Sequence, residues 1–182
     1  LRDGEKEFTR AVAGSTARGE CPDVPHAPGG DADGSPKGLG DALVAAATDA
    51  GIRMTLLDTC YLAGGFDTPL DQVQLRFSGG DANRWAERVS AMTPTTEIRI
   101  GTAIHSVRAV AADQMRIVSA YAEEQGSPLH AHLSEQGAEN VACVEARECT
   151  PAQLIAESGT VGERTIAVHA TTCTTGEVTW PQ

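Results

Sequence analysis

Histidine and glutamate side chains with a spacing suited to metal or acid–base chemistry occur in the segment PLHAHLSEQGAEN, residues 128–140. His130 and His132 are two positions apart, which places them on the same side of a β-strand, and Glu135 follows His132 by three positions. An imidazole can bind a metal that activates water, and a nearby carboxylate can carry the proton. The alternative is a strand whose histidines are hydrogen bonded in the core, and for this pair alone that alternative is favoured.

Two more histidines change this balance. His105 ends the apolar run in GTAIHS and His169 ends the one in IAVHAT, each about one strand–loop–helix–loop unit away from His132. Successive parallel strands would bring the three imidazoles to the same height at the C-terminal edge of a sheet, where α/β proteins bind ligands. A site therefore becomes the favoured interpretation of His132 and Glu135.

Other polar residues near the predicted strand ends are weaker candidates. Arg108 lies in the loop after His105 and could pair with a carboxylate, although a lone loop arginine is more typical of solvated surface. Asp58 and Tyr61 could line the site, but the sequence does not favour it. Glu139 and Asn140 fit the polar start of a helix better than chemistry.

No other catalytic signature is visible. The cysteines have no activating neighbour in sequence. The chain also has neither a glycine-rich phosphate-binding fingerprint nor a G-x-S-x-G motif.

Alternating helices and strands must position these residues. Apolar runs of strand length alternate with segments of helical composition, such as the one in which Trp85, Val89 and Met92 share a face. Thr150 and Pro151 are typical of a helix start. The predicted helices are 38–51, 81–92, 111–126 and 150–159, and the predicted strands are 52–60, 97–105, 128–135 and 164–171. This alternation predicts an α/β fold with a parallel sheet whose two faces are both covered.

The chain divides by composition into two parts. Residues 1–36 are rich in Pro, Gly and Asp and are expected to be irregular. Residues 37–182 are expected to form the single domain, in keeping with the length of 182 residues.

Charge and composition exclude several classes of partner. The net charge of −11 and the 4% content of aromatic residues argue against nucleic acid and anionic membranes. No segment approaches the roughly 20 apolar residues of a membrane span, and the first ten residues lack the apolar core of a signal peptide. Five cysteines without a C-x-x-C motif are expected to be free thiols in a reducing cytoplasm.

The segments TLLDTCYLAGGF, GTAIHSVRAV, PLHAHLSEQGAEN and TIAVHAT together resemble the formimidoylglutamate deiminases, a branch of the amidohydrolase superfamily. The resemblance runs from about residue 38 to residue 172 and implies a zinc-dependent (β/α)8 TIM-type barrel, of which this chain would form roughly strands 3 to 6. It implies hydrolysis of a small acidic substrate, N-formimidoyl-L-glutamate, to N-formyl-L-glutamate and ammonia in histidine degradation.

The same resemblance implies a role for each candidate residue. His132 corresponds to the zinc ligand of the fifth strand, and Glu135 to the shuttle that protonates the leaving nitrogen. His169 corresponds to the sixth-strand histidine that orients or deprotonates the zinc-bound water. His105 and Arg108 correspond to substrate-binding residues, with Arg108 suited to a carboxylate.

The sequence departs from the family pattern at other metal positions. FTRAVAG, residues 8–14, resembles the segment that follows the family's first-strand H-x-H, and Gly4 and Lys6 would then stand at the ligand positions. The strand-eight aspartate has no counterpart before Gln182, and Thr172 stands where the family usually has a histidine.

A catalytic zinc usually takes three protein ligands, and only His132 matches one here. We therefore expect a truncated piece of the deiminase that binds no zinc by itself and is inactive alone. The alternatives are another amidohydrolase-superfamily deaminase, acting on a guanine-like or triazine-like substrate, and a non-catalytic barrel fragment that needs a partner chain. A homo-oligomer is compatible with the sequence.

Overall fold

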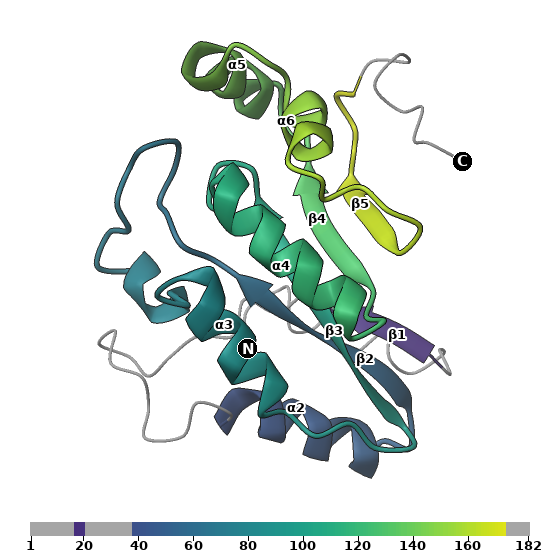
Figure 1. Ribbon diagram of the computed structural model, residues 1–182. Helices are drawn as coiled ribbons and strands as arrows, with labels where there is room; N and C mark the ends of the chain where they lie inside the picture. The colour runs from purple at the N-terminus through teal and green to yellow at the C-terminus, as the bar shows by residue number, and fades with distance from the viewer. Residues whose placement is uncertain (1–16, 21–37, 174–182) are drawn as a thin grey trace.

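The computed structural model describes residues 17–20 and 38–173. Within them, a single sheet has all its strands parallel and in the same order as in the chain (Figure 1). The strands are β1 (Ala17–Glu20), β2 (Arg53–Cys60), β3 (Ile98–Ser106), β4 (Leu129–Leu133) and β5 (Thr165–His169). This order agrees with the predicted α/β class, since helices connect the later strands one after another.

Helices separate successive strands of the described chain. They are α2 (Gly38–Asp49), the 3-10 helix η1 (Gln74–Phe77), α3 (Ala82–Ser90), α4 (Ala112–Glu124), α5 (Gly137–Arg147) and α6 (Pro151–Glu157). In Figure 1, α4 runs alongside β3 and β4, and α5 and α6 follow the end of β4. None of the described helices is long and apolar enough to cross a membrane.

Alternation along each strand separates the core from the histidines. In β4 the side chains of Leu129, Ala131 and Leu133 are buried in the same apolar cluster as residues of α3, α4, α5 and α6. His130 and His132 are half-buried and, because side chains alternate along a strand, lie on the opposite face. The helix-facing side of the sheet is therefore the core, and the other side carries the histidines.

Local sequence signals account for several helix ends. Asp81 starts α3 by accepting the backbone N–H groups of Asn83 and Arg84 at 2.9 Å. Thr150 starts α6 with a capping box, followed by Pro151 in the first turn, as predicted. Gly51 follows α2 with a φ of 66°, a left-handed conformation typical of a helix C-cap.

Two elements were missed, wholly or in part, by sequence reasoning. β1 lies within residues 1–36, which were expected to be irregular; its sequence, ARGE, has no apolar alternation and becomes a strand by pairing with β2. For α5 only a helix start at Glu139 and Asn140 was predicted and its extent was missed, because Val141 and Val144 are exposed and its apolar period is weak. The predicted ligand positions Gly4 and Lys6 lie outside the described residues.

Candidate functional site

Three histidines from three successive strands lie in one row at the C-terminal edge of the sheet. The ring centroids of His105 and His132 are 5.4 Å apart, and those of His132 and His169 are 5.3 Å apart with nearly parallel planes. Tyr61, which directly follows β2, packs edge-on against His105, with the two ring centroids 4.5 Å apart. The structure thus brings together the three predicted histidines and the weaker candidate Tyr61.

The ring of His132 is oriented by its neighbouring strand. Its Nδ1 lies 2.8 Å from the backbone carbonyl oxygen of His105. The pairing of β3 with β4 shifts register between Ile104 and Ser106, so this carbonyl belongs to an irregular step of the ladder. Because a carbonyl can only accept, Nδ1 carries the hydrogen and Nε2 keeps a lone pair for a metal or a proton.

His105 is a neutral group in this row. Burial, and after it the electrostatic influence of His132 and Arg108, lowers the pKa of His105 to about 4. Its Nδ1 lies 3.0 Å from the hydroxyl of Ser106. A neutral imidazole can donate or accept a hydrogen bond without adding charge to the site.

Glu135 and His169 meet at the exposed end of the row. The Oε1 atom of Glu135 lies 3.8 Å from Nε2 of His169, and both side chains are partly exposed. The predicted proton shuttle and the predicted water-orienting histidine are therefore neighbours. An exposed pair of this kind contributes little to stability, so the contact matters mainly for where the two groups are held.

The loops after β4 and β5 are hydrogen bonded to each other. The backbone carbonyl of Ser134 accepts from Thr172 N at 3.0 Å, from Thr172 Oγ1 at 2.7 Å and from Thr171 Oγ1 at 3.2 Å. Thr171 Oγ1 also lies 2.6 Å from the carbonyl of Glu135. We call Ser134, Glu135, Thr171 and Thr172 the threonine clamp, and it holds the Glu135 segment beside the His169 segment.

Two helix residues support the clamp. A carboxylate oxygen of Glu139 accepts the backbone N–H of Glu135 at 3.1 Å, and the side-chain amide of Asn140 donates to the carbonyl of Thr172 at 3.0 Å. Sequence reasoning placed both residues at a helix start, where they are, but missed these contacts. Nothing in the sequence spacing alone indicates them.

The backbone is strained at this edge. Ser134, His169 and Ala170 have positive φ values of 47°, 69° and 51°, in a region that non-glycine residues seldom occupy. Each such residue costs about 1 kcal/mol or more and persists only where its surroundings enforce it. Here the threonine clamp holds these residues in the left-handed conformation, and the resulting turns direct Glu135 and His169 toward each other.

Asp58 does not line the site. It lies on the helix-facing side of β2, where its Oδ1 atom is 2.7 Å from the NH2 nitrogen of Arg88 in α3. Only 4% of the Asp58 side chain and 14% of the Arg88 side chain are exposed. On the same side of β2, burial raises the pKa of Cys60 to about 12, which makes it a poor nucleophile.

Arg108 is exposed and lines a cavity of about 450 Å³, which none of the three histidines of the row lines. Phe66, Asp67 and Arg147 line the same cavity. The Arg147 guanidinium pairs with both carboxylate oxygens of Asp67, at 2.6 and 2.7 Å, and lies over the Phe66 ring. Sequence reasoning did not single out Arg147, which reaches the cavity from the last turn of α5.

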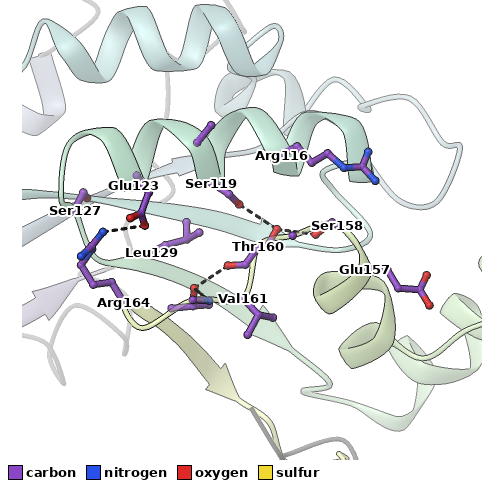
Figure 2. A pocket seen from close by; sticks show the side chains of 15 residues that line it. Arg116, Ser119, Glu123, Ser127, Leu129, Glu157, Ser158, Thr160, Val161 and Arg164 are labelled. Atoms are coloured by element: carbon purple, nitrogen blue, oxygen red, sulfur yellow. Dashed lines mark hydrogen bonds and ion pairs between the residues drawn. The ribbon is translucent and has the colours of Figure 1, made fainter. Parts of the chain in front are cut away.

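A second cavity, of about 430 Å³, lies between α4 and the loop that precedes β5 (Figure 2). Its hydroxyl groups bond to one another: Ser119 donates to Thr160 at 3.1 Å, and Ser158 and Thr160 are 2.6 Å apart. It contains none of the predicted site residues.

The described part of the chain supplies only part of the ligand set that a metal ion would need. His132 offers a free Nε2 and a second nitrogen held by a carbonyl, which is the arrangement usual for a metal ligand. However, residues 17–20 and 38–173 contain no group of three or more His, Cys, Asp or Glu side chains placed to hold a metal ion. The described residues fit one ligand of such a centre and not the whole of it.

Comparison with known proteins places this geometry in a family. The profile of the Amidohydrolase family matches residues 30–181. The chain is 33% identical over 169 residues to the formimidoylglutamate deiminase of Pseudomonas aeruginosa, an alignment that covers 91% of this chain and 37% of the relative. The chain thus spans little more than a third of the length of this relative.

Solved structures agree on the fold. An amidohydrolase from Brucella melitensis is similar with a TM-score of 0.81 and 27% identity, over 94% of this chain and 39% of that one. A triazine hydrolase from Arthrobacter aurescens matches with a TM-score of 0.70 and 22% identity, over 90% of this chain and 35% of that one. An adenosine deaminase from Xanthomonas campestris with bound zinc matches with a TM-score of 0.66 and 20% identity, over 92% of this chain and 33% of that one.

These matches confirm the predicted partial barrel, since the parallel sheet corresponds to part of larger amidohydrolase structures. The family match covers most of the sequence, and the curated relative is aligned along nearly all of it. The chain belongs to the Amidohydrolase family.

Proposed function

We propose that this chain forms the substrate-binding and proton-transfer side of a site that hydrolyses N-formimidoyl-L-glutamate to N-formyl-L-glutamate and ammonia, a cytoplasmic step of histidine degradation. The observation that carries the proposal is the row of His105, His132 and His169 with Glu135 at its end. The similarity to a curated formimidoylglutamate deiminase supports the choice of substrate.

His132 would hold a zinc ion through Nε2, because its Nδ1 hydrogen is engaged by the His105 carbonyl. When bound, the metal supplies a Lewis acid that activates water at neutral pH. The described residues give only this one well-oriented ligand, so the other ligands would come from elsewhere.

Glu135 and His169 are suited to proton transfer. In the proposed reaction water adds to the formimidoyl carbon, and Glu135 protonates the nitrogen that leaves as ammonia. His169 orients the attacking water or takes its proton. The 3.8 Å contact between the two side chains and the clamp behind them support this division of roles.

His105 and Arg108 are suited to bind a carboxylate of the substrate. Arg108 brings a positive charge to the rim of an otherwise acidic protein, whose net charge is −11, and a guanidinium pairs well with a carboxylate. The low pKa of His105 keeps this imidazole neutral, so it contributes a hydrogen bond and Arg108 contributes the charge.

A chimeric barrel tests the proposal. Residues 38–172 would replace the aligned segment of the Pseudomonas aeruginosa relative, and ammonia release would be measured with N-formimidoyl-L-glutamate. We expect turnover that Glu135→Gln lowers by roughly 100-fold or more, as for loss of a general acid. A chimera that is folded and carries zinc, yet releases no ammonia, would refute the proposed role.

Substrate class is tested in the same chimera with Arg108→Ala. We expect the variant to release ammonia more slowly than the unmodified chimera from the acidic substrate, and at the same rate from a neutral amidine of similar size. Equal loss with both would favour the alternative of a deaminase for an uncharged substrate.

A second candidate is a non-catalytic chain that works only with a partner, which includes a homo-oligomer. The incomplete ligand set among the described residues favours it for the isolated chain. We expect the purified chain with added zinc to release no ammonia. Turnover with one zinc bound per chain would rule this candidate out.

A further inference from the structure

The carboxylate of Glu139, in the first turn of α5, has two oxygens with different surroundings. The residue is only 8% exposed. Its Oε2 atom accepts the backbone N–H of Glu135 at 3.1 Å. Its Oε1 atom is shielded from solvent and has no hydrogen-bond partner among the residues that the structure describes. Buried polar atoms are almost always paired, so a buried carboxylate that uses one oxygen for a single backbone group calls for an explanation.

Helix capping accounts for only part of this arrangement. α5 begins at Gly137, and the side chain of its N-cap residue, Gln136, makes no capping bond. A glutamate at the third helical position ordinarily reaches back to the N–H of the N-cap residue itself. Glu139 reaches one residue further, to Glu135. The first turn is already closed by the backbone, since the N–H of Glu139 donates to the Gln136 carbonyl at 2.9 Å. The side chain of Glu139 therefore fixes the segment before the helix.

Glu135, the residue held in this way, is fixed through both of its backbone polar groups. Its N–H donates to Glu139 of α5, and its carbonyl accepts from the hydroxyl of Thr171, in the loop after β5, at 2.6 Å. Its carboxylate is 48% exposed, and one of its oxygens lies 3.8 Å from Nε2 of His169. With the backbone held from two separate segments, only the side-chain torsions of Glu135 are left to move its carboxylate.

The kind of acceptor matters as well as its place. A carboxylate oxygen holds an N–H more strongly than a neutral oxygen does. Burial of a carboxylate with an unpartnered oxygen opposes folding, and residues that break a local rule in this way are concentrated at functional sites. The position of Glu139 next to the candidate site agrees with a role in holding that site in place.

We propose that Glu139 is a positioning residue for proton transfer, which keeps the carboxylate of Glu135 beside His169 by holding the Glu135 backbone. The inference rests on the proposed function, in which Glu135 protonates the leaving nitrogen. Glu139 acts through Glu135, with no contact of its own to the substrate or a metal. Displacement of a reacting group by about 1 Å can slow a reaction by about 100-fold, so a backbone bond at this place is enough to affect the rate.

Hydrogen exchange in the full chain tests the contact without any need for turnover. Exchange of the Glu135 amide hydrogen would be followed by nuclear magnetic resonance in wild type and in Glu139→Ala. We expect exchange of this amide to be at least tenfold faster in the variant, because its acceptor is lost. Glu145→Ala, which removes an exposed glutamate of the same helix, is the matched control and should leave the exchange unchanged.

A milder variant guards against loss of folding. Glu139→Gln keeps an oxygen acceptor but loses the negative charge, and circular dichroism would confirm that it is folded. The Glu135 amide should still exchange faster than in wild type, because a neutral acceptor holds the N–H less strongly. Exchange at the wild-type rate in the folded Glu139 variants would overturn the inference.

A double-mutant cycle tests the effect on the reaction, in the chimera with the Pseudomonas aeruginosa relative. We expect Glu139→Gln to lower kcat about tenfold and to change KM less than twofold, whereas Glu145→Gln changes neither. In the background of Glu135→Gln, the same Glu139 substitution should have no further effect on kcat, since no carboxylate is left to position. A merely structural role would lower the rate equally in both backgrounds.

The two measurements separate this inference from the proposed function. A folded chimera that carries zinc and releases no ammonia would refute the reaction, while hydrogen exchange would still decide whether Glu139 holds Glu135. The role of Glu139 in proton transfer is overturned if the active chimera keeps its kcat in Glu139→Gln. It is also overturned if the loss is the same with and without the Glu135 carboxylate.

Discussion

A single hydrogen bond decides which nitrogen of His132 faces the site. The His105 carbonyl fixes the hydrogen on Nδ1 and leaves Nε2 available. The spacing of His105, His132 and His169 was enough to predict that they would lie together, because it repeats once per βα unit. The orientation of the ring was not predictable, since it depends on a register shift between Ile104 and Ser106.

The buried pair of Asp58 and Arg88 gives the first prediction at the residue scale. Arg88→Ala would leave the Asp58 carboxylate buried without its partner, and we expect a loss of about 3–5 kcal/mol in the free energy of unfolding. Urea denaturation would measure it. The matched control is Arg84→Ala, which removes an exposed pair with Asp81 and should cost less than about 1 kcal/mol. Equal effects of the two variants would contradict the argument.

The threonine clamp gives a second prediction. Thr172→Val removes the hydroxyl that donates to the Ser134 carbonyl at 2.7 Å and keeps the size of the side chain. We expect the free energy of unfolding to fall by about 1 kcal/mol. Thr172→Ser retains the hydroxyl, so its free energy of unfolding should stay closer to that of the wild type. A valine variant as stable as the serine variant would show that this hydrogen bond contributes nothing.

At the scale of elements, two features hold the sheet and helices together. Apolar and polar side chains alternate along a strand, and neighbouring strands pack closely. Helix-facing positions of β4 are apolar, whereas the opposite face carries the histidines. Gly101 on β3 shows how tightly neighbouring strands pack: an added Cβ would collide with the Leu57 side chain and lie 3.0 Å from Thr55 Cγ2. Small residues there let the strands and their side chains fit together.

Gly101→Ala should therefore destabilise the sheet. Overpacking of this kind costs about 1–3 kcal/mol, which a urea or thermal unfolding curve would detect. Gly137→Ala serves as the control, because its added Cβ would point into open space; it should leave stability unchanged or raise it by up to about 1 kcal/mol. Equal stability of the Gly101 variant and wild type would mean that Leu57 can move aside freely.

The sequence predicted the later strands and four of the helices because apolar runs and caps mark them locally. It missed β1 and the extent of α5, where such signals are weak: ARGE has no apolar alternation, and Val141 and Val144 are exposed. It also missed the clamp, which relies on left-handed backbone at Ser134 and His169. Neither residue type signals that conformation, since contacts with a distant loop impose it.

At the scale of the whole molecule, the described sheet is part of a barrel with β5 at one side. β5 pairs with β4, and Ile166 on β5 is 45% exposed. Strand edges with exposed apolar side chains tend to pair with other chains. The family's solved structures are longer than this chain, which covers 39% of the Brucella melitensis amidohydrolase.

We therefore expect the isolated chain to self-associate in a concentration-dependent way, as measured by light scattering after size-exclusion chromatography. Ile166→Lys should shift the protein toward monomer, because a lysine at a strand edge opposes pairing. Val141→Lys, on the exposed side of α5, is the matched control and should not. A wild-type chain that is monomeric at every concentration would contradict this expectation.

The order of the strands has one more consequence. Each described strand bonds only to strands that come just before or just after it in the chain, so every sheet contact closes a loop no longer than one βα unit. These loops are of similar length, so the entropy cost of closing each one is similar, and parallel pairing across a whole βα unit is slow to form. The architecture can therefore be lengthened or shortened one unit at a time. The neighbours of each histidine are set by the units next to it, whatever the total number of units.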